Sequence, residues 1–145
     1  MYTLQAFKRF GFSQFIAAAV VSFMAYSNIA LGDEIKVALS GDKEVPPVTT
    51  AAKGSGIIAI NADRTVSGSV TTTGLSGTMA HIHFGAVGVN GPVIVPLSKS
   101  GDNVWMVPAG AKLTEDQYQA YKAGELYINV HTAANKGGEI RGQIK

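Results

Sequence analysis

The chain has 145 residues, of which 46% are hydrophobic, with 17 glycines, 5 prolines, no cysteine and a formal net charge of +2. This length and composition indicate one turn-rich globular domain. The lack of cysteine excludes disulfides, thiolate catalysis and cysteine-ligated metals. Nucleic acid is not an expected partner, because no basic stripe with interleaved aromatic residues is present.

Residues 1–32 have the pattern of a secretory signal peptide. Lys8 and Arg9 precede a charge-free run over residues 10–32, whose apolar centre spans residues 15–26. A basic start followed by about a dozen apolar residues is typical of a cleaved leader. The apolar centre is short for a membrane span, which needs about 20 residues. An uncleaved membrane anchor remains the alternative.

Small residues at positions −3 and −1 predict cleavage after Gly32, with cleavage after Ala30 as the second choice. The mature domain is then residues 33–145, with a net charge near zero because the two leader cations are removed. No later segment is long and apolar enough to span a membrane. We therefore expect a protein exported to the periplasm or the extracellular space, with no membrane association after cleavage.

The mature sequence predicts short strands separated by turns. Residues 40–48 form an extended surface loop, because two prolines interrupt regular structure, and 61–64 and 98–103 are turns. Alternating or continuous apolar residues predict the strands, at 34–39, 54–60, 65–73, 78–84, 93–97, 104–107, 126–131 and 139–144.

One short helix is predicted over residues 115–123. Thr114 and Gln117 have the spacing of a capping box, and Gly124 is suited to the position after the last helical turn. Together with the strands, this pattern predicts an all-β sandwich of seven to eight strands with one short helix.

All three histidines of the chain lie in two of the predicted strands. His81 and His83 share one strand face, since successive side chains of a strand alternate. His131 lies opposite the apolar face of residues 126–131. If these strands are neighbours, three imidazoles converge outside the core, and three neutral imidazoles suit copper or zinc. The predicted metal ligands are therefore His81, His83 and His131.

Further residues share these faces. Met79 lies on the face of His81 and could add a thioether ligand, whereas Tyr127 and Asn129 lie on the face of His131 and could orient the ligands. The alternative is a metal-free arrangement, in which the histidines form hydrogen bonds with the backbone of the loops around residues 85–91 and 132–138. We expect Glu139 and Arg141 to form an ion pair, and Trp105 to pack in the core or at its edge.

Several motifs resemble the CHRD domain family, named after chordin. They are Leu39–Val48, Ala80–Gly85, Asn90–Val93, Leu113–Thr114 and Ala123–Ile144, and the resemblance covers residues 35–144. It implies an immunoglobulin-like, Greek-key β-sandwich. It implies little about activity, because the domain has no generally accepted biochemical function.

A second resemblance is to copper–zinc superoxide dismutase, whose copper is held partly by a His-x-His strand and a late Val-His. Here His81 and His83 match the pair, Val130-His131 matches the late histidine, and Gly142–Ile144 resembles the closing strand. No histidine matches the ligand that bridges the two metals, and zinc ligands and the family disulfide have no counterpart. The role of the dismutase arginine is not carried over to Arg141, which aligns at a different position.

Three functions are consistent with these features. The first is an exported, non-enzymatic protein that stores, buffers or delivers copper, with zinc as the alternative metal. The second is a metal-free structural or protein-interaction module with a partner in the cell envelope. The third, a dismutase-like redox enzyme, is disfavoured by the missing fourth histidine and zinc site.

Overall fold

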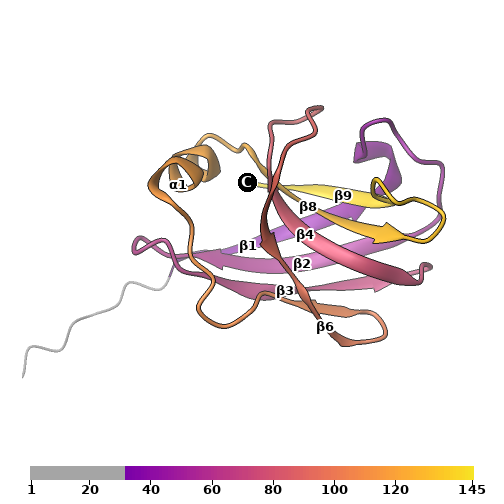
Figure 1. Ribbon diagram of the computed structural model, residues 1–145, viewed down its shortest axis with the longest axis horizontal. Helices are drawn as coiled ribbons and strands as arrows, with labels where there is room; N and C mark the ends of the chain where they lie inside the picture. Colours follow the sequence, from indigo (N-terminus) through magenta and orange to yellow (C-terminus); the bar gives the residue numbers. More distant parts are fainter. Residues whose placement is uncertain (1–31) are drawn as a thin grey trace, which may run out of the picture.

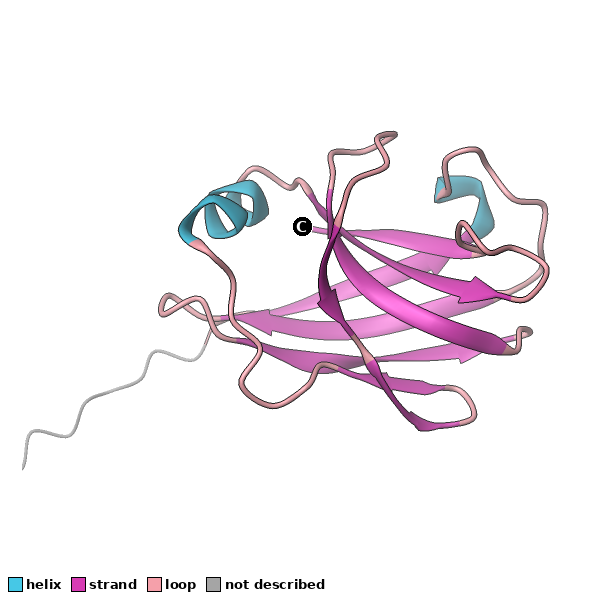
Figure 2. Cartoon of the chain, viewed as in Figure 1, coloured by secondary structure: helices cyan, strands magenta, loops and turns pink. Residues whose placement is uncertain are grey.

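The computed structural model describes residues 32–145, so the predicted signal peptide lies outside the described residues except for Gly32. These residues form an all-β fold with one α-helix and one 3-10 turn (Figures 1 and 2). The strands are β1 (Glu34–Ser40), β2 (Lys53–Ile60), β3 (Val66–Thr73), β4 (Gly77–Phe84), β5 (Val93–Pro96), β6 (Ser98–Gly101), β7 (Val104–Met106), β8 (Leu126–Thr132) and β9 (Ile140–Ile144).

The nine strands are hydrogen-bonded in the order β5-β4-β8-β9-β1-β2-β3-β7-β6, and all their pairings are antiparallel. The sheet folds over on itself, and its two halves meet through the single registered pair Ser40 and Arg141. One half contains β5, β4, β8 and β9, and the other contains the remaining five strands. The predicted β-sandwich is therefore confirmed.

The prediction of seven to eight strands is wrong by one. Residues 98–101, expected to be part of a turn, form β6, which pairs with β7. All four residues of β6 are exposed, so the segment carries no buried apolar face. Hydrophobic periodicity cannot detect such a strand, because backbone pairing alone defines it.

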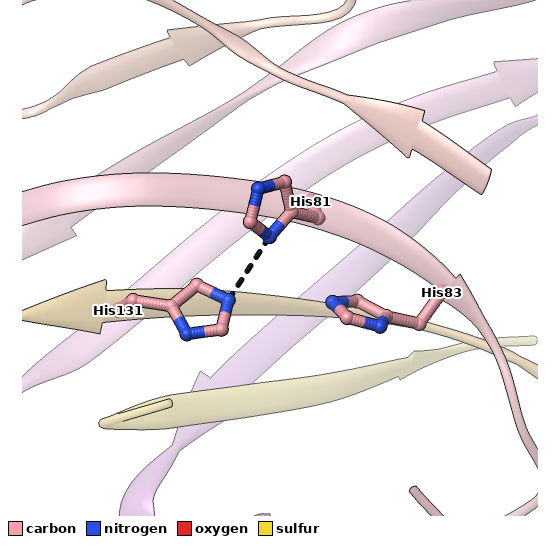
Figure 3. Close-up of side chains that lie close together, drawn as sticks. All are labelled: His81, His83 and His131. Atoms are coloured by element: carbon pink, nitrogen blue, oxygen red, sulfur yellow. Dashed lines mark hydrogen bonds between the residues drawn. The ribbon is translucent and has the colours of Figure 1, made fainter. Parts of the chain in front are cut away.

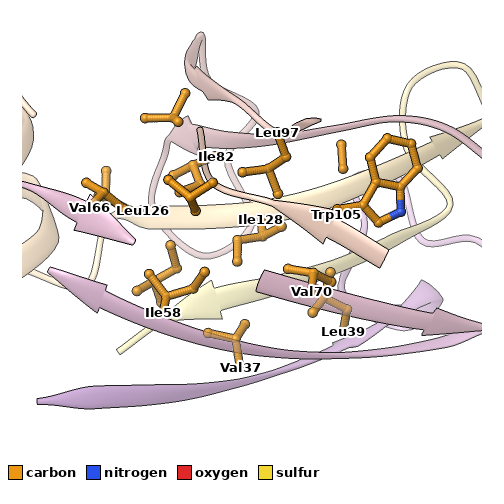
Figure 4. Close-up of a cluster of buried hydrophobic side chains, with 14 of the residues drawn as sticks. Val37, Leu39, Ile58, Val66, Val70, Ile82, Leu97, Trp105, Leu126 and Ile128 are labelled. Atoms are coloured by element: carbon orange, nitrogen blue, oxygen red, sulfur yellow. The ribbon is translucent and has the colours of Figure 1, made fainter. Parts of the chain in front are cut away.

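The core lies between the two halves of the sandwich (Figure 4). Ile82 and Ile128 from β4 and β8 face Ile58 and Val70 from β2 and β3, and all four side chains are fully buried. Trp105 fills one end of this layer and is 2% exposed, as predicted. The alternation of apolar residues along each strand places these side chains inward and leaves the opposite face of each strand for polar residues.

Helix α1 (Glu115–Lys122) begins with the predicted capping box. The Thr114 hydroxyl accepts a hydrogen bond from the Gln117 amide at 3.2 Å, and the Gln117 side chain accepts one from the Thr114 amide at 2.9 Å. Gly124 follows the helix with φ +74°, a conformation that favours glycine. No helix within residues 32–145 has the length and apolarity needed to cross a membrane.

Segment 40–48 is more compact than the predicted extended loop. It begins with a 3-10 turn, η1 (Gly41–Lys43), and continues to Glu44, which lies against Gly138 in the loop before β9. The side chain of Glu44 is only 4% exposed. This segment and two other loops, 85–92 and 133–139, cover the outer face of β8, while the core covers its inner face, so all seven residues of β8 are buried.

Candidate metal centre

The three predicted ligands converge on the outer face of β4 and β8 (Figure 3). These strands are neighbours in the sheet, and the register places His81 opposite Asn129 and Met79 opposite His131. One ring nitrogen from each of His81, His83 and His131 lies within 4.8 Å of the others. Ligand nitrogens around a shared metal lie about 2 Å from it, and hence about 3.3–3.6 Å apart. The observed spacing needs only small side-chain movements to reach that geometry.

Two backbone carbonyls fix the ring orientations. Nδ1 of His83 lies 2.9 Å from the Gly91 carbonyl, and Nδ1 of His131 lies 2.9 Å from the Lys136 carbonyl. A carbonyl can only accept, so both Nδ1 atoms carry the proton in the neutral ring, and both Nε2 atoms carry a lone pair. This carbonyl arrangement is typical of the second shell of a metal site.

His81 faces the cluster with Nδ1, whereas His83 and His131 face it with Nε2. Its Nδ1 lies 3.0 Å from Nε2 of His131, and this contact is drawn as a dashed line in Figure 3. Because the lone pair of His131 accepts here, Nδ1 of His81 donates. His81 is only partly buried, so its ring proton can exchange with solvent. The proton can then move to Nε2, which frees a third lone pair for the cluster.

The Nε2 atom of His83 is buried and has no hydrogen-bond partner among residues 32–145. A buried polar atom without a partner costs free energy, so native proteins usually satisfy it. The His83 and His131 side chains are each 7% exposed. The histidines therefore lie on the polar face of their strands as predicted, but loops cover two of them.

Burial favours the neutral form of His81 and His83. Desolvation is the main cause that lowers the pKa of His81 and His83, and the neighbouring histidines lower both further. For His83, the Gly91 carbonyl opposes this effect. A neutral imidazole is the form that binds a metal, so competition from protons is weaker here than for an exposed histidine.

A stack of three side chains links this cluster to the next strand. The Tyr127 ring lies parallel to His83, with 4.7 Å between centroids, and the Arg141 guanidinium lies 3.4 Å from the Tyr127 centroid. Arg141 is 1% exposed and donates to the carbonyls of Ala86 and Val89 at 2.9 Å. It thereby holds the loop whose Gly91 carbonyl orients His83.

Arg141 does not form the predicted ion pair with Glu139. The Glu139 carboxylate instead accepts hydrogen bonds from Thr50 and Thr132 at 2.8 and 2.7 Å. Strand periodicity placed Glu139 and Arg141 on one face, but it could not show which loops lie over each of them.

Glu44 belongs to the Leu39–Val48 motif, but the sequence did not indicate that its carboxyl is buried beside β8. It lies against Asn129, which sits on β8 between Tyr127 and His131, and against Gly138, where a Cβ would overlap its Oε1 atom. Burial raises the pKa of Glu44 to about 7, although Arg141, the Val45 amide and Asn129 favour the ionised form. Its Oε1 atom has no hydrogen-bond partner among the described residues.

Comparison with known proteins supports the fold assignment. No curated protein and no solved structure matches the chain, so the resemblance to copper–zinc superoxide dismutase is not confirmed. The CHRD domain family matches residues 35–144. This range includes the helix, the histidine cluster and all nine strands, apart from the first residue of β1. The chain therefore belongs to the CHRD domain family.

Proposed function

We propose that this protein is an exported, non-enzymatic module that binds copper through His81, His83 and His131, and that it stores, buffers or delivers the metal. Zinc is the alternative metal, because three neutral imidazoles suit both ions. Export is supported by the leader pattern and by the occurrence of CHRD domains in extracellular or secreted proteins.

The observation that carries this proposal is the convergence of three imidazole nitrogens, one from each histidine, within 4.8 Å of one another, beside the buried Nε2 of His83 that has no partner among residues 32–145. Three protein ligands complete a trigonal site for Cu(I), or leave a fourth position open on Zn(II). The non-enzymatic assignment is supported by the residue inventory. The chain has three histidines and no cysteine, so it has no further histidine to build a second metal site.

The metal-free alternative is a structural or protein-interaction module of the cell envelope. It is favoured by the hydrogen bonds of His83 and His131 to Gly91 and Lys136. These bonds, however, use only Nδ1 of each ring. They leave Nε2 of both residues directed at the cluster. Without a metal, Nε2 of His83 has no hydrogen-bond partner in the part of the chain that the structure describes.

The proposal is tested by titrating copper and zinc into the protein and into a variant with all three histidines replaced by alanine. We expect one equivalent to bind to the parent protein and none to the variant. A control, Glu34→Gln with Asp102→Asn, removes two exposed carboxylates and should bind as the parent does.

Circular dichroism establishes that the triple variant folds. Since His83 and His131 are buried, His81→Ala alone serves as a milder variant, and it should weaken copper binding without loss of structure. If the folded triple variant binds copper as tightly as the parent, the assignment of the site is wrong.

A further inference from the structure

A methionine lies beside the histidine cluster and has no role in the core. Met79 alternates with His81 and His83 along β4, and it is the direct cross-strand neighbour of His131 on β8. Cβ atoms of such cross-strand neighbours lie about 4.5–5.5 Å apart. Met79 therefore stands on the same face as all three histidines and next to two of them.

The side chain of Met79 is exposed to solvent. Its side chain is 50% exposed, whereas its neighbours Ala80 and Ile82, on the other strand face, are 1% and 0% exposed. A methionine has three rotatable side-chain bonds and a polarisable sulfur, so an exposed one can swing toward a neighbouring group at little cost. Met79 does not belong to the hydrophobic core, so a movement toward the cluster disrupts no core packing.

The donor atoms present in the chain limit which metal ion the cluster would bind. With no cysteine present, thioether sulfur is the only soft side-chain donor available. Thioether ligands select Cu(I), whereas zinc sites use imidazole, thiolate and carboxylate. The three imidazoles carry no negative charge, which also suits a monovalent ion.

We propose that Met79 is a fourth, thioether ligand of the histidine cluster and that the site selects Cu(I) over Zn(II). This inference rests on the proposed copper-binding function. The buried nitrogens of His83 and His131 bind the ion on its protein side, and the sulfur of Met79 binds it on its solvent side. An exposed ligand at this place is the one that an incoming or departing copper ion meets first.

The test compares Met79→Leu, which keeps the size and apolar character of the side chain, with Met106→Leu. Met106 is 41% exposed and lies on β7 in the other half of the sandwich, so it is a matched control. Cu(I) affinity is measured under anaerobic, reducing conditions against a chromogenic chelator, and Zn(II) affinity is measured in parallel.

We expect Met79→Leu to lower Cu(I) affinity by about tenfold or more and to leave Zn(II) affinity unchanged, because only the soft ion uses the sulfur. Met106→Leu should match the parent for both ions. X-ray absorption of the Cu(I)-loaded parent should show a sulfur ligand that is lost in Met79→Leu; since the chain lacks cysteine, that sulfur can come only from methionine.

The outcomes separate this inference from the function on which it rests. If the parent binds no copper, or if the triple histidine variant binds it equally well, the proposed function fails. If the triple variant loses copper but Met79→Leu binds Cu(I) as the parent does, the site stands and the thioether ligand is refuted. Equal losses of Cu(I) and Zn(II) affinity in Met79→Leu also refute it, since they indicate a distorted cluster.

Discussion

The buried carboxyl of Glu44 gives the fold a pH-dependent cost that a single substitution should remove. The ordinary pKa of a glutamate is 4.5, and burial raises that of Glu44 to about 7. A carboxyl with a raised pKa holds its proton more tightly in the folded state than in the unfolded state. Between pH 4.5 and 7 the folded state therefore binds more protons, and stability falls as the pH rises.

The size of the effect follows from the shift. Each pKa unit corresponds to about 1.4 kcal/mol, so ionising Glu44 costs the folded state about 3 kcal/mol once the pH exceeds 7. The cost is small at pH 5, grows through pH 6 and levels off by pH 8. The Glu44 side chain is 4% exposed, so solvent screens this cost little.

Glu44→Gln replaces the carboxyl by a neutral group of the same shape. We compare the free energy of unfolding of the variant with that of the parent. This difference should favour the variant by about 2–3 kcal/mol more at pH 8 than at pH 5. Urea denaturation followed by tryptophan fluorescence measures both, because the single tryptophan, Trp105, is buried in the core. Titration of the histidines affects both proteins alike and cancels in the difference.

The exposed Glu34 provides the control, and Glu34→Gln should show no such pH-dependent difference. The reasoning is refuted if the stability difference between Glu44→Gln and the parent is the same at pH 5 and pH 8. That result would mean that Arg141 and Asn129 compensate fully for the burial of the carboxylate.

Three further predictions concern the metal site and the core. Arg141→Lys removes the forked contacts that hold loop 85–92, and it should lower copper affinity by about tenfold in a chelator competition while the fold persists. Ile82→Ala should reduce the free energy of unfolding, measured in urea, by about 2–5 kcal/mol, because this side chain is fully buried. Ile57→Ala, at a 46% exposed position, should reduce it by less than about 1 kcal/mol, and equal losses would contradict the core assignment. Copper binding should stay constant from pH 8 to 7 and weaken only below pH 6.5, because the pKa values of His81 and His83 lie below 6.5, the ordinary value of histidine. A loss of binding already at pH 7.5, measured by titration, would contradict the burial of these two histidines.

Much of the candidate site could be read from local patterns. The spacing of His81 and His83 fixes them on one strand face, and the apolar residues of 126–131 place His131 on the face opposite the core. The metal-free alternative, with histidine hydrogen bonds to the backbone around residues 85–91 and 132–138, also agrees with the observed carbonyl partners Gly91 and Lys136. The capping box at Thr114 fixed the start of the helix.

Other features depend on contacts between distant segments. Nothing in the local sequence indicates that Arg141 reaches over Tyr127 to the loop before Gly91, because these positions are far apart in the chain. The burial of Glu44 is likewise decided by the segment that folds over β8. Strand β6 was missed because its residues bury no apolar side chain.

The sequence by itself determined the all-β class, the helix, and the faces on which the three histidines stand, because strand alternation and capping act over a few residues. Only the tertiary structure decided that β4 pairs with β8, which brings one nitrogen of each imidazole within 4.8 Å of the others. It also decided that loops cover His83 and His131, and that burial lowers the pKa of His83. Strand order and loop burial arise from contacts across the whole chain, so short-range patterns cannot encode them.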